Sequence, residues 1–383
     1  MNGRVFQRRR GKGLPWSYVV DAGRDQSGRR KQRMKGGFRT KADAERALRE
    51  LLHSLDTASY VEPSKRGVGQ YLVEEWLPAI RSTVKPTTFD QYRMLIVAHV
   101  QPRIGDIGLQ ALTPAHLNAL YGELVSSGRK DGQGGLSTKT VRHVHTTLRK
   151  ALGDAVRWGR LARNPASLAD PPRVLAPELK VWDSAQMRKF LASVRDDRLY
   201  AAWLLLATTG VRRGELLGLR WEDLDLERAK LSVRRAVTVV RGEPVATEPK
   251  TAKGRRTLSL DPATLAALCA HLQRQREERI AAGPAWQEFG LVFCRADGSA
   301  FNPEAVSRHF MHRVAAVGLP NIGIHGLRHS YATAALAAGV SAKVVSERLG
   351  HASVAITLDV YSHVLPAHDE EAASKVAAHI LGH

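Results

Sequence analysis

Two short segments in the second half of the chain concentrate side chains that could bind a phosphate group. In TTGVRRGELLGLRW, Arg212 and Glu215 lie where a glycine-containing turn enters a predicted helix, and in IGIHGLRHSYAT, His325 precedes Arg328. The two residues of each pair are three positions apart, a spacing that places both side chains on one face of a helix. A guanidinium stays charged and donates two parallel hydrogen bonds, so each arginine is suited to hold an oxyanion.

A third segment, RLGHASVAITLDVYSHV, contains His351 and, ten residues later, Tyr361. A predicted β-hairpin, EPKTAKGRRTLSL, places Lys250 and Lys253 near its turn. Taken singly, these residues have ordinary structural roles, such as a helix-face ion pair or a tyrosine in the core. Their combination, Arg, Lys, His, Arg, His and Tyr in this order, is more informative than any one of them.

The order of these residues resembles that of the tyrosine recombinase, or phage integrase, family. The family's arginine motif is recognisable in Thr209 to Trp221, its His-x-x-Arg box in His325 to Arg328, its Leu-Gly-His box in Leu349 to His351 and its nucleophile in Tyr361. The resemblance implies a site-specific DNA recombinase that cleaves and rejoins strands through a 3′-phosphotyrosyl intermediate. It implies these catalytic residues: Arg212, Lys250, His325, Arg328, His351 and Tyr361.

The resemblance also implies a role for each group. The arginines bind the scissile phosphate, the histidines hydrogen-bond it or accept the tyrosine proton, and a lysine protonates the departing 5′ oxygen. The Pro-Lys-Thr context favours Lys250 over Lys253 for that lysine, and we expect Glu215 to orient Arg212 or to stabilise its helix. Because the phosphotyrosyl ester conserves the free energy of the broken bond, no cofactor, ATP or metal ion is expected.

The composition indicates the same class of partner. The 383 residues include 58 Lys and Arg against 37 Asp and Glu, a net charge of +21 that favours nucleic acid over an anionic membrane surface. We find neither an apolar run long enough to span a membrane nor an apolar signal region, so we expect a soluble protein of the bacterial cytoplasm, associated with the nucleoid. The two cysteines make neither a disulfide scaffold nor a four-ligand metal site.

The patterning predicts a mainly helical α+β protein of three domains. Residues 1–60 read as a small three-stranded sheet with one helix, and residues 66–166 as a helical, SAM-like core-binding domain. A proline-containing linker at 167–180 cannot continue a helix. Residues 181–383 show strands confined to one stretch between helices, which predicts a mixed α/β domain of the tyrosine recombinase type.

Residues 1–60 carry 15 Lys and Arg against 6 Asp and Glu, and they resemble the arm-type DNA-binding domain of integrases of the lambda kind. The resemblance implies double-stranded DNA with core and arm attachment sites as the partner, a homo-tetramer on that DNA, and room for accessory bending or directionality factors. The predicted DNA contacts come from one basic hairpin: Arg29, Arg30, Lys31, Arg33 and Lys35.

The last predicted helix, HDEEAASKVAAHILGH, repeats Ala372, Val376 and Ile380 every four positions. A helix this short is marginal alone, so its apolar face needs a groove. The family resemblance implies that it packs on a neighbouring subunit, and docking on its own subunit is the alternative.

Other functions fit some of these residues. A metal site could use four histidines, but Arg328 and Arg348 put cations where the metal would lie. Those histidines are His325, His329, His351 and His363. A DNA-binding regulator, an inactive recombinase homologue without strand transfer and a type IB topoisomerase are further alternatives. The arm-like module favours recombination between defined sites.

Overall fold

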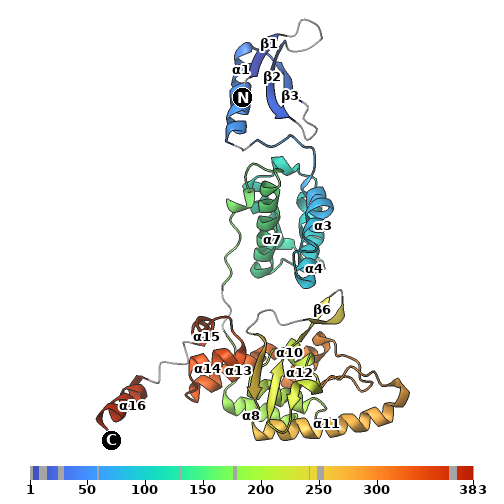
Figure 1. The fold of residues 1–383 in the computed structure, drawn as a ribbon, viewed down its shortest axis with the longest axis vertical. Helices are drawn as coiled ribbons and strands as arrows, with labels where there is room; N and C mark the ends of the chain where they lie inside the picture. Colours follow the sequence, from blue (N-terminus) through green and yellow to red (C-terminus); the bar gives the residue numbers. More distant parts are fainter. Residues whose placement is uncertain are drawn as a thin grey trace. The chain divides into compact units, whose positions relative to one another are not determined.

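The structure is a computed structural model in which the chain divides into two units, Met1–Leu175 and Ala176–His383 (Figure 1). The division lies inside the predicted linker at 167–180. No helix in the described part of the chain is both long enough and apolar enough to cross a bilayer. The described residues are 3–7, 15–24, 30–57, 60–129, 131–175, 179–240, 242–247, 254–361 and 369–382.

The amino-terminal module is an antiparallel sheet, in the order β1-β2-β3, covered on one face by a helix. Tyr18 and Val20 of the central strand pack against Leu48 of the helix. The Thr40 hydroxyl accepts a hydrogen bond from the Asp43 backbone at 3.1 Å and so caps the helix. The elements are β1 Gly3–Gln7, β2 Trp16–Arg24, β3 Arg30–Phe38 and α1 Lys41–Asp56.

The second module of this unit is helical and has its own core. Trp76 is fully buried in that core and donates from its indole nitrogen to an Asp154 carboxylate oxygen at 2.8 Å. The long elements are α4 Pro86–Leu95, α6 Pro114–Ser127 and α7 Thr138–Arg157. The short ones are α2 Val68–Gln70, η1 Tyr71–Trp76, α3 Leu77–Ile80, η2 Ile96–Val100, α5 Gln101–Ile104, η3 Leu109–Ala111 and η4 Pro165–Ser167.

Two of the short segments, η1 and η2, are π-helical turns inside otherwise α-helical stretches. A proline follows each of them, Pro78 in α3 and Pro102 in α5. Proline lacks a backbone N–H and its ring clashes with the carbonyl four residues earlier, so a widened turn before each proline lets the helix continue. The sequence pattern predicts the helices but not these turns.

The second unit surrounds two small sheets with helices. The first sheet has the order β4-β5-β8, and β6 pairs with β7 in the second. The core of this second unit centres on Trp182, Phe190, Trp203 and Phe310. The strands are β4 Leu224–Asp225, β5 Lys230–Val233, β6 Ala236–Val240, β7 Glu243–Thr247 and β8 Arg256–Ser259.

The helices of the second unit precede and follow these strands (Figure 1). Before them come α8 Ser184–Ser193, α9 Tyr200–Thr209, α10 Arg213–Leu217 and η5 Trp221–Asp223. After them come α11 Pro262–Ala282, η7 Gly283–Ala285, α12 Pro303–Val317, α13 Ile324–Ala337, α14 Ala342–Leu349, α15 Val354–Tyr361 and α16 Asp369–Leu381. The predicted mainly helical α+β fold is confirmed.

Candidate active site

The arginine motif lies at the turn between α9 and α10. Helix α9 ends at Gly210, whose φ of 64° is a left-handed conformation that favours glycine. Arg212 follows in extended backbone, and Glu215 lies in the short helix α10. The Glu215 carboxylate accepts from the Arg212 backbone at 2.9 Å and from its guanidinium at 2.6 Å. The predicted pairing of these two residues is therefore present, and it fixes the direction of the Arg212 side chain.

Arg328 comes from the second motif and is almost completely buried in α13. Its guanidinium donates to the Gly210 carbonyl and to the Leu349 carbonyl, both at 2.7 Å. The guanidinium of Arg212 donates to the next carbonyl, that of Gly350, at 3.1 Å. The two arginines predicted to bind one phosphate therefore meet at adjacent carbonyls.

These carbonyls belong to the end of α14. Gly350 caps the helix in a left-handed conformation, with a φ of 66°. The last carbonyls of an α-helix have no partner within the helix, and the helix dipole gives that end partial negative charge. Both features favour guanidinium donors at this position, so the Leu-Gly-His segment organises the arginines as well as supplying His351.

His351 follows Gly350 directly and is held by α15. Its Nδ1 atom is 2.8 Å from the hydroxyl oxygen of Thr357, a side chain that is fully buried. Because the second ring nitrogen makes no hydrogen bond that the structure describes within the protein, it is the candidate contact for a substrate. Desolvation of the ring and the nearby positive charges of Arg328 and Arg212 lower the pKa of His351 to about 4.

His325 lies in the first turn of α13, with its ring centroid 4.9 Å from that of His329 in an edge-to-face arrangement. Desolvation by the surrounding protein atoms, the neighbouring His329 and the charge of Arg328 lower the pKa of His325 to about 4. At neutral pH, both His325 and His351 are therefore uncharged. The positive charge of the described site comes from arginine.

One further charged residue of this site, Arg256 of β8, was not predicted from the sequence. Its guanidinium donates two hydrogen bonds to the Glu215 carboxylate, at 2.8 and 3.2 Å. Burial opposes ionisation of Glu215, but the hydrogen bonds and charge of Arg256, with those of Arg212, outweigh it and lower the pKa of the carboxyl group. Strand alternation could have revealed Arg256, because it has the same phase as the buried Leu258 and Leu260.

The remaining predicted residues are placed less completely. Tyr361 is the last residue of α15, and its side chain lies outside what the structure describes. Lys250 and Lys253 both lie outside the described residues. In the described part of the chain, no group of three or more His, Cys, Asp or Glu side chains could hold a metal ion.

Two of the predicted DNA contacts of the amino-terminal module, Arg33 and Lys35, lie two residues apart on β3 and therefore on the same side of the sheet. Arg33 and Lys35 pair with Val20 and Tyr18 of β2, the residues that face α1. Arg33 lies over the Tyr60 ring at 4.2 Å and 3.8 Å from a Glu62 carboxylate oxygen. Arg29 lies outside the described residues, as do the side chains of Arg30 and Lys31.

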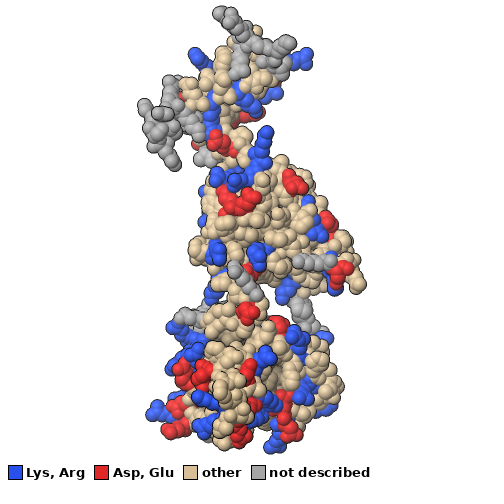
Figure 2. All heavy atoms as spheres, turned by 90° about the vertical axis from the view of Figure 1, so that its right-hand side faces the viewer, with Lys and Arg blue, Asp and Glu red and all other residues tan. Residues whose placement is uncertain are grey.

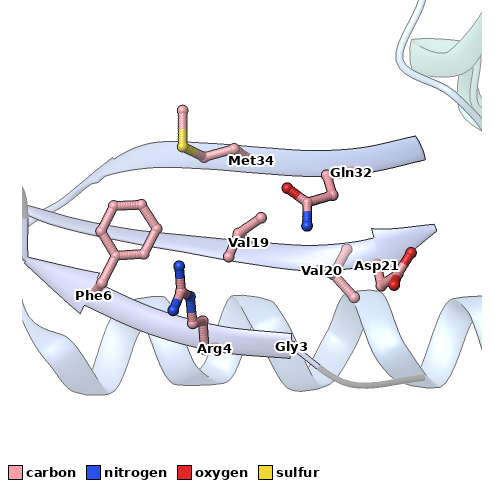
Figure 3. Close-up of a pocket in the computed structure, with 8 residues that line it drawn as sticks. All are labelled: Gly3, Arg4, Phe6, Val19, Val20, Asp21, Gln32 and Met34. Atoms are coloured by element: carbon pink, nitrogen blue, oxygen red, sulfur yellow. The ribbon is translucent and has the colours of Figure 1, made fainter. Parts of the chain in front are cut away.

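The other side of this sheet carries a hollow with a mixed polar and apolar lining (Figure 3). Arg4, Val19 and Met34 are cross-strand partners in its centre, and Asp21 pairs with Gln32 beside them. The sequence analysis did not single out these residues, because no short spacing links them.

Positive side chains are spread over the rest of the molecule. Figure 2 shows Lys and Arg intermingled with Asp and Glu on the face drawn, over both units. The whole chain has a net charge of +21, but on the face drawn the positive side chains do not gather into one patch.

Family comparisons match the modules in chain order. The phage integrase family matches residues 180–368, an arm DNA-binding domain matches residues 5–55, and the SAM-like N-terminal domain of phage integrases matches residues 70–125. Both predicted DNA-binding modules thus have counterparts among integrases.

Individual relatives extend over most of the chain. A XerC-like tyrosine recombinase of Caldanaerobacter subterraneus is 29% identical over 368 residues, covering 91% of this chain and 92% of that protein. The putative prophage phiRv2 integrase of Mycobacterium tuberculosis is 29% identical over 353 residues, covering 88% of this chain and 86% of that protein.

Solved structures show the same fold. The Tn1549 transposon integrase in complex with transposon right end DNA has a TM-score of 0.66 at 22% identity, over 82% of this chain and 100% of that chain. The lambda integrase tetramer bound to a Holliday junction has a TM-score of 0.58 at 19% identity, over 93% of this chain and 94% of that chain. With the arginine, histidine and tyrosine motifs inside the catalytic match, the chain belongs to the phage integrase family of tyrosine recombinases, which recombine DNA at specific sites.

Proposed function

We propose that this recombinase cleaves a DNA strand by attack of the Tyr361 hydroxyl oxygen on the scissile phosphorus. The new oxygen–phosphorus bond replaces the bond to the 5′ oxygen, which leaves a 3′-phosphotyrosyl ester and a free 5′ hydroxyl. The observation that carries the proposal is the convergence of Arg212 and Arg328 on the carbonyls of Gly350 and Leu349, directly before His351. Attack by another strand's 5′ hydroxyl reverses the step and rejoins the DNA.

The charges of the site support this role. Arg212 and Arg256 bond the Glu215 carboxylate, and Arg328 bonds the Gly210 and Leu349 carbonyls. Three guanidiniums and one described carboxylate leave two net positive charges. The phosphate gathers negative charge as the phenol attacks, and preorganised donors stabilise that charge without reorganising during the reaction. One arginine in such a position is worth roughly 10³ to 10⁵ in rate in other phosphoryl transfers.

The two histidines act as neutral groups in this proposal. With a pKa of about 4 in the absence of DNA, His351 carries no charge at neutral pH and presents its second ring nitrogen to the substrate. In that form it either donates to a phosphate oxygen or accepts the Tyr361 proton, and the negative charge of a bound phosphate favours its protonation. His325 offers a second neutral donor.

The general acid of the proposal is Lys250, with Lys253 as the alternative. A lysine protonates the departing 5′ oxygen, so its loss should matter little when that oxygen is replaced by sulfur, a better leaving group. Cleavage by Lys250→Ala should therefore be rescued by a 5′-thiol substrate, whereas Lys253→Ala should cleave ordinary DNA nearly normally. Rescue of Lys253→Ala instead would assign the acid to Lys253.

We propose that the amino-terminal module binds arm sites through the open face of its sheet (Figure 3). A narrow sheet fits the DNA major groove, where Arg reads guanine and Gln reads adenine. Arg4 and Gln32 lie on this face, whereas Arg33 is engaged by Tyr60 and Glu62. Arg4→Ala and Gln32→Ala should weaken binding to an arm site and leave core-site binding unchanged. Loss of core binding would contradict this assignment.

The proposal extends to the assembly. We propose that the protein binds core and arm DNA as a tetramer, with accessory bending or directionality factors as further partners. We also propose that it acts in the cytoplasm, at the nucleoid. The lambda integrase tetramer bound to a Holliday junction supports the tetramer by similarity of fold. Analytical ultracentrifugation with DNA carrying two core sites tests it, because a tetramer should appear only with DNA.

The deciding experiment uses Tyr361→Phe on suicide DNA substrates. Wild type should form a covalent complex linked to a 3′ phosphate, in the presence of EDTA as well as without it. Tyr361→Phe should bind the same DNA and form no covalent complex, because only the attacking oxygen is removed. A covalent complex with the variant would refute the nucleophile, and a wild type that binds without cleaving would indicate an inactive homologue or a regulator.

A further inference from the structure

Three consecutive backbone carbonyls at the end of α14 each accept a hydrogen bond from a different arginine. The donor and acceptor pairs are Arg256 Nε to Arg348 O at 2.6 Å, Arg328 Nη2 to Leu349 O at 2.7 Å, and Arg212 Nη2 to Gly350 O at 3.1 Å. The two arginines proposed to bind the phosphate and a third arginine, Arg256, are therefore all held by the same short backbone segment.

Arg256 is fixed more completely than a surface arginine. Its side chain is 7% exposed, and its Nη1 and Nη2 atoms both bond Glu215, whose side chain is 3% exposed. A bidentate guanidinium–carboxylate pair has one preferred geometry. The side chain therefore joins the start of β8, the helix α10 and the end of α14.

The contact between Arg256 and Glu215 also affects Arg212, because both arginines bond the same carboxylate. The carboxylate is shared by two guanidiniums, so the three groups together keep one positive charge. Without Arg256, the Glu215 charge is matched by Arg212 alone, and the remaining pair presents no net charge to a phosphate. At low effective dielectric, a carboxylate 2.6 Å from the Arg212 guanidinium would then compete directly with the substrate for it.

We propose that Arg256 is a positioning residue for strand cleavage, which balances Glu215 so that Arg212 stays available to the scissile phosphate and holds the α14 carbonyls in place. The inference rests on the proposed function of Arg212 and Arg328. Arg256 itself touches no reacting atom. It acts through Glu215 and through the Arg348 carbonyl.

The test compares Arg256→Gln, Arg256→Lys and the double variant Glu215→Gln/Arg256→Gln in single-turnover cleavage of a core-site suicide DNA at saturating protein. Loss of a residue that orients the ligands of a metal site commonly costs roughly 10- to 100-fold in activity, and we expect a comparable slowing for Arg256→Gln, because Arg256 orients Arg212 in the same indirect way. Arg256→Lys keeps the charge and should recover part of the rate. The double variant restores one net positive charge to the trio and should cleave faster than Arg256→Gln.

Arg255→Gln is the matched control, because it removes one positive charge from the exposed neighbouring residue. It should cleave within about twofold of wild type. A merely structural role for Arg256 predicts the reverse order for the double variant, since removing both buried partners would disturb the packing further. Wild-type cleavage by Arg256→Gln, or a double variant slower than the single one, would overturn the proposal.

A second measurement needs no cleavage. Titration of His351 by NMR in DNA-free protein should show a higher pKa in Arg256→Gln, because a nearby positive charge is lost, and a lower one again after Glu215→Gln is added. A His351 pKa that both changes leave unmoved would overturn the charge-balance argument. If wild type forms no covalent complex, the proposed function fails while this titration still decides the role of Arg256.

Discussion

Replacing Arg328 with lysine should impair both folding and catalysis, because this side chain contributes to each. Arg328 is 3% exposed and donates to two backbone carbonyls that lie far apart in sequence, at Gly210 and Leu349. A lysine ammonium is a point donor that cannot span both carbonyls as the planar guanidinium does. At least one buried carbonyl therefore loses its charged partner.

The structure sets the size of the effect. Hydrogen bonds to charged groups contribute about 1.5–3 kcal/mol each, so losing one of the two should lower the free energy of unfolding by about that amount. In a unit of about 200 residues, each kcal/mol shifts Tm by about 2–4 °C, which predicts a fall of about 3–12 °C. Cleavage should slow by at least about 100-fold as well, because the fork that holds the phosphate is gone.

Arg212→Lys is the matched comparison. The Arg212 side chain is 39% exposed, and Glu215 keeps both bonds from Arg256 when Arg212 is shortened. We expect a similar loss of cleavage with a Tm within about 3 °C of wild type and with DNA affinity changed much less than the rate. Calorimetry and single-turnover cleavage measure the two quantities. Equal Tm losses for the two variants would refute the distinction, and equal losses of rate and affinity would indicate a purely electrostatic DNA clamp.

Further predictions concern the histidines and the two ends of the chain. His325 and His351 resist protonation in the folded state down to a pKa of about 4, whereas unfolded histidine binds a proton near pH 6.5, so urea titrations should show the free energy of unfolding falling from pH 7 to pH 5; a rise would contradict neutral histidines. Thr357→Val should lower the free energy of unfolding by about 1 kcal/mol and slow cleavage, while Thr357→Ser should cleave at the wild-type rate. Normal cleavage by the valine variant would show that Thr357 does not orient His351 for catalysis. Deleting residues 1–60 should abolish arm-site binding and spare core cleavage, and an unchanged footprint would reduce the module to a tail. Ending the chain at His368 should leave the monomer's Tm intact and block cooperative assembly, whereas a lower Tm would indicate docking on its own subunit.

Local sequence signals predicted the elements that depend on neighbouring residues. Thr113 caps α6 and Ser137 caps α7, as their positions before apolar helical repeats indicate. The strands β5, β6 and β8 also form in one stretch between helices, as predicted for residues 181–383. Caps and hydrophobic periods act over a few residues, so a single sequence contains the information that they need.

The facing of Arg33 and Lys35 could not be predicted in the same way. Alternation along β3 says that these two residues share a side, but it does not say which side is covered. Their register against Tyr18 and Val20, and the packing of α1 on that side, decide it. Lys35 stays exposed on the helix side of the sheet, and Arg4, Asp21 and Gln32 lie at the hollow on the other side.

At the candidate site, side-chain chemistry was predictable and backbone chemistry was not. Arg212, His325, Arg328 and His351 stand out because their types and their order along the chain resemble the motifs of the family. What brings Arg212 and Arg328 to His351 is the end of α14, whose backbone carbonyls are present whatever the side chains are.

Arg256 illustrates that limit most clearly, because its partners lie 41 and 92 residues away. No spacing rule connects such positions. Strand alternation can indicate that Arg256 lies on the buried side of β8, but only the completed fold shows that its partners are Glu215 and the Arg348 carbonyl. A buried guanidinium must find hydrogen-bond partners, since leaving that charge unpaired costs several kcal/mol. The end of α14 and Glu215 are the partners it finds, so the same requirement that stabilises the fold also links Arg256 to the carboxylate that holds Arg212.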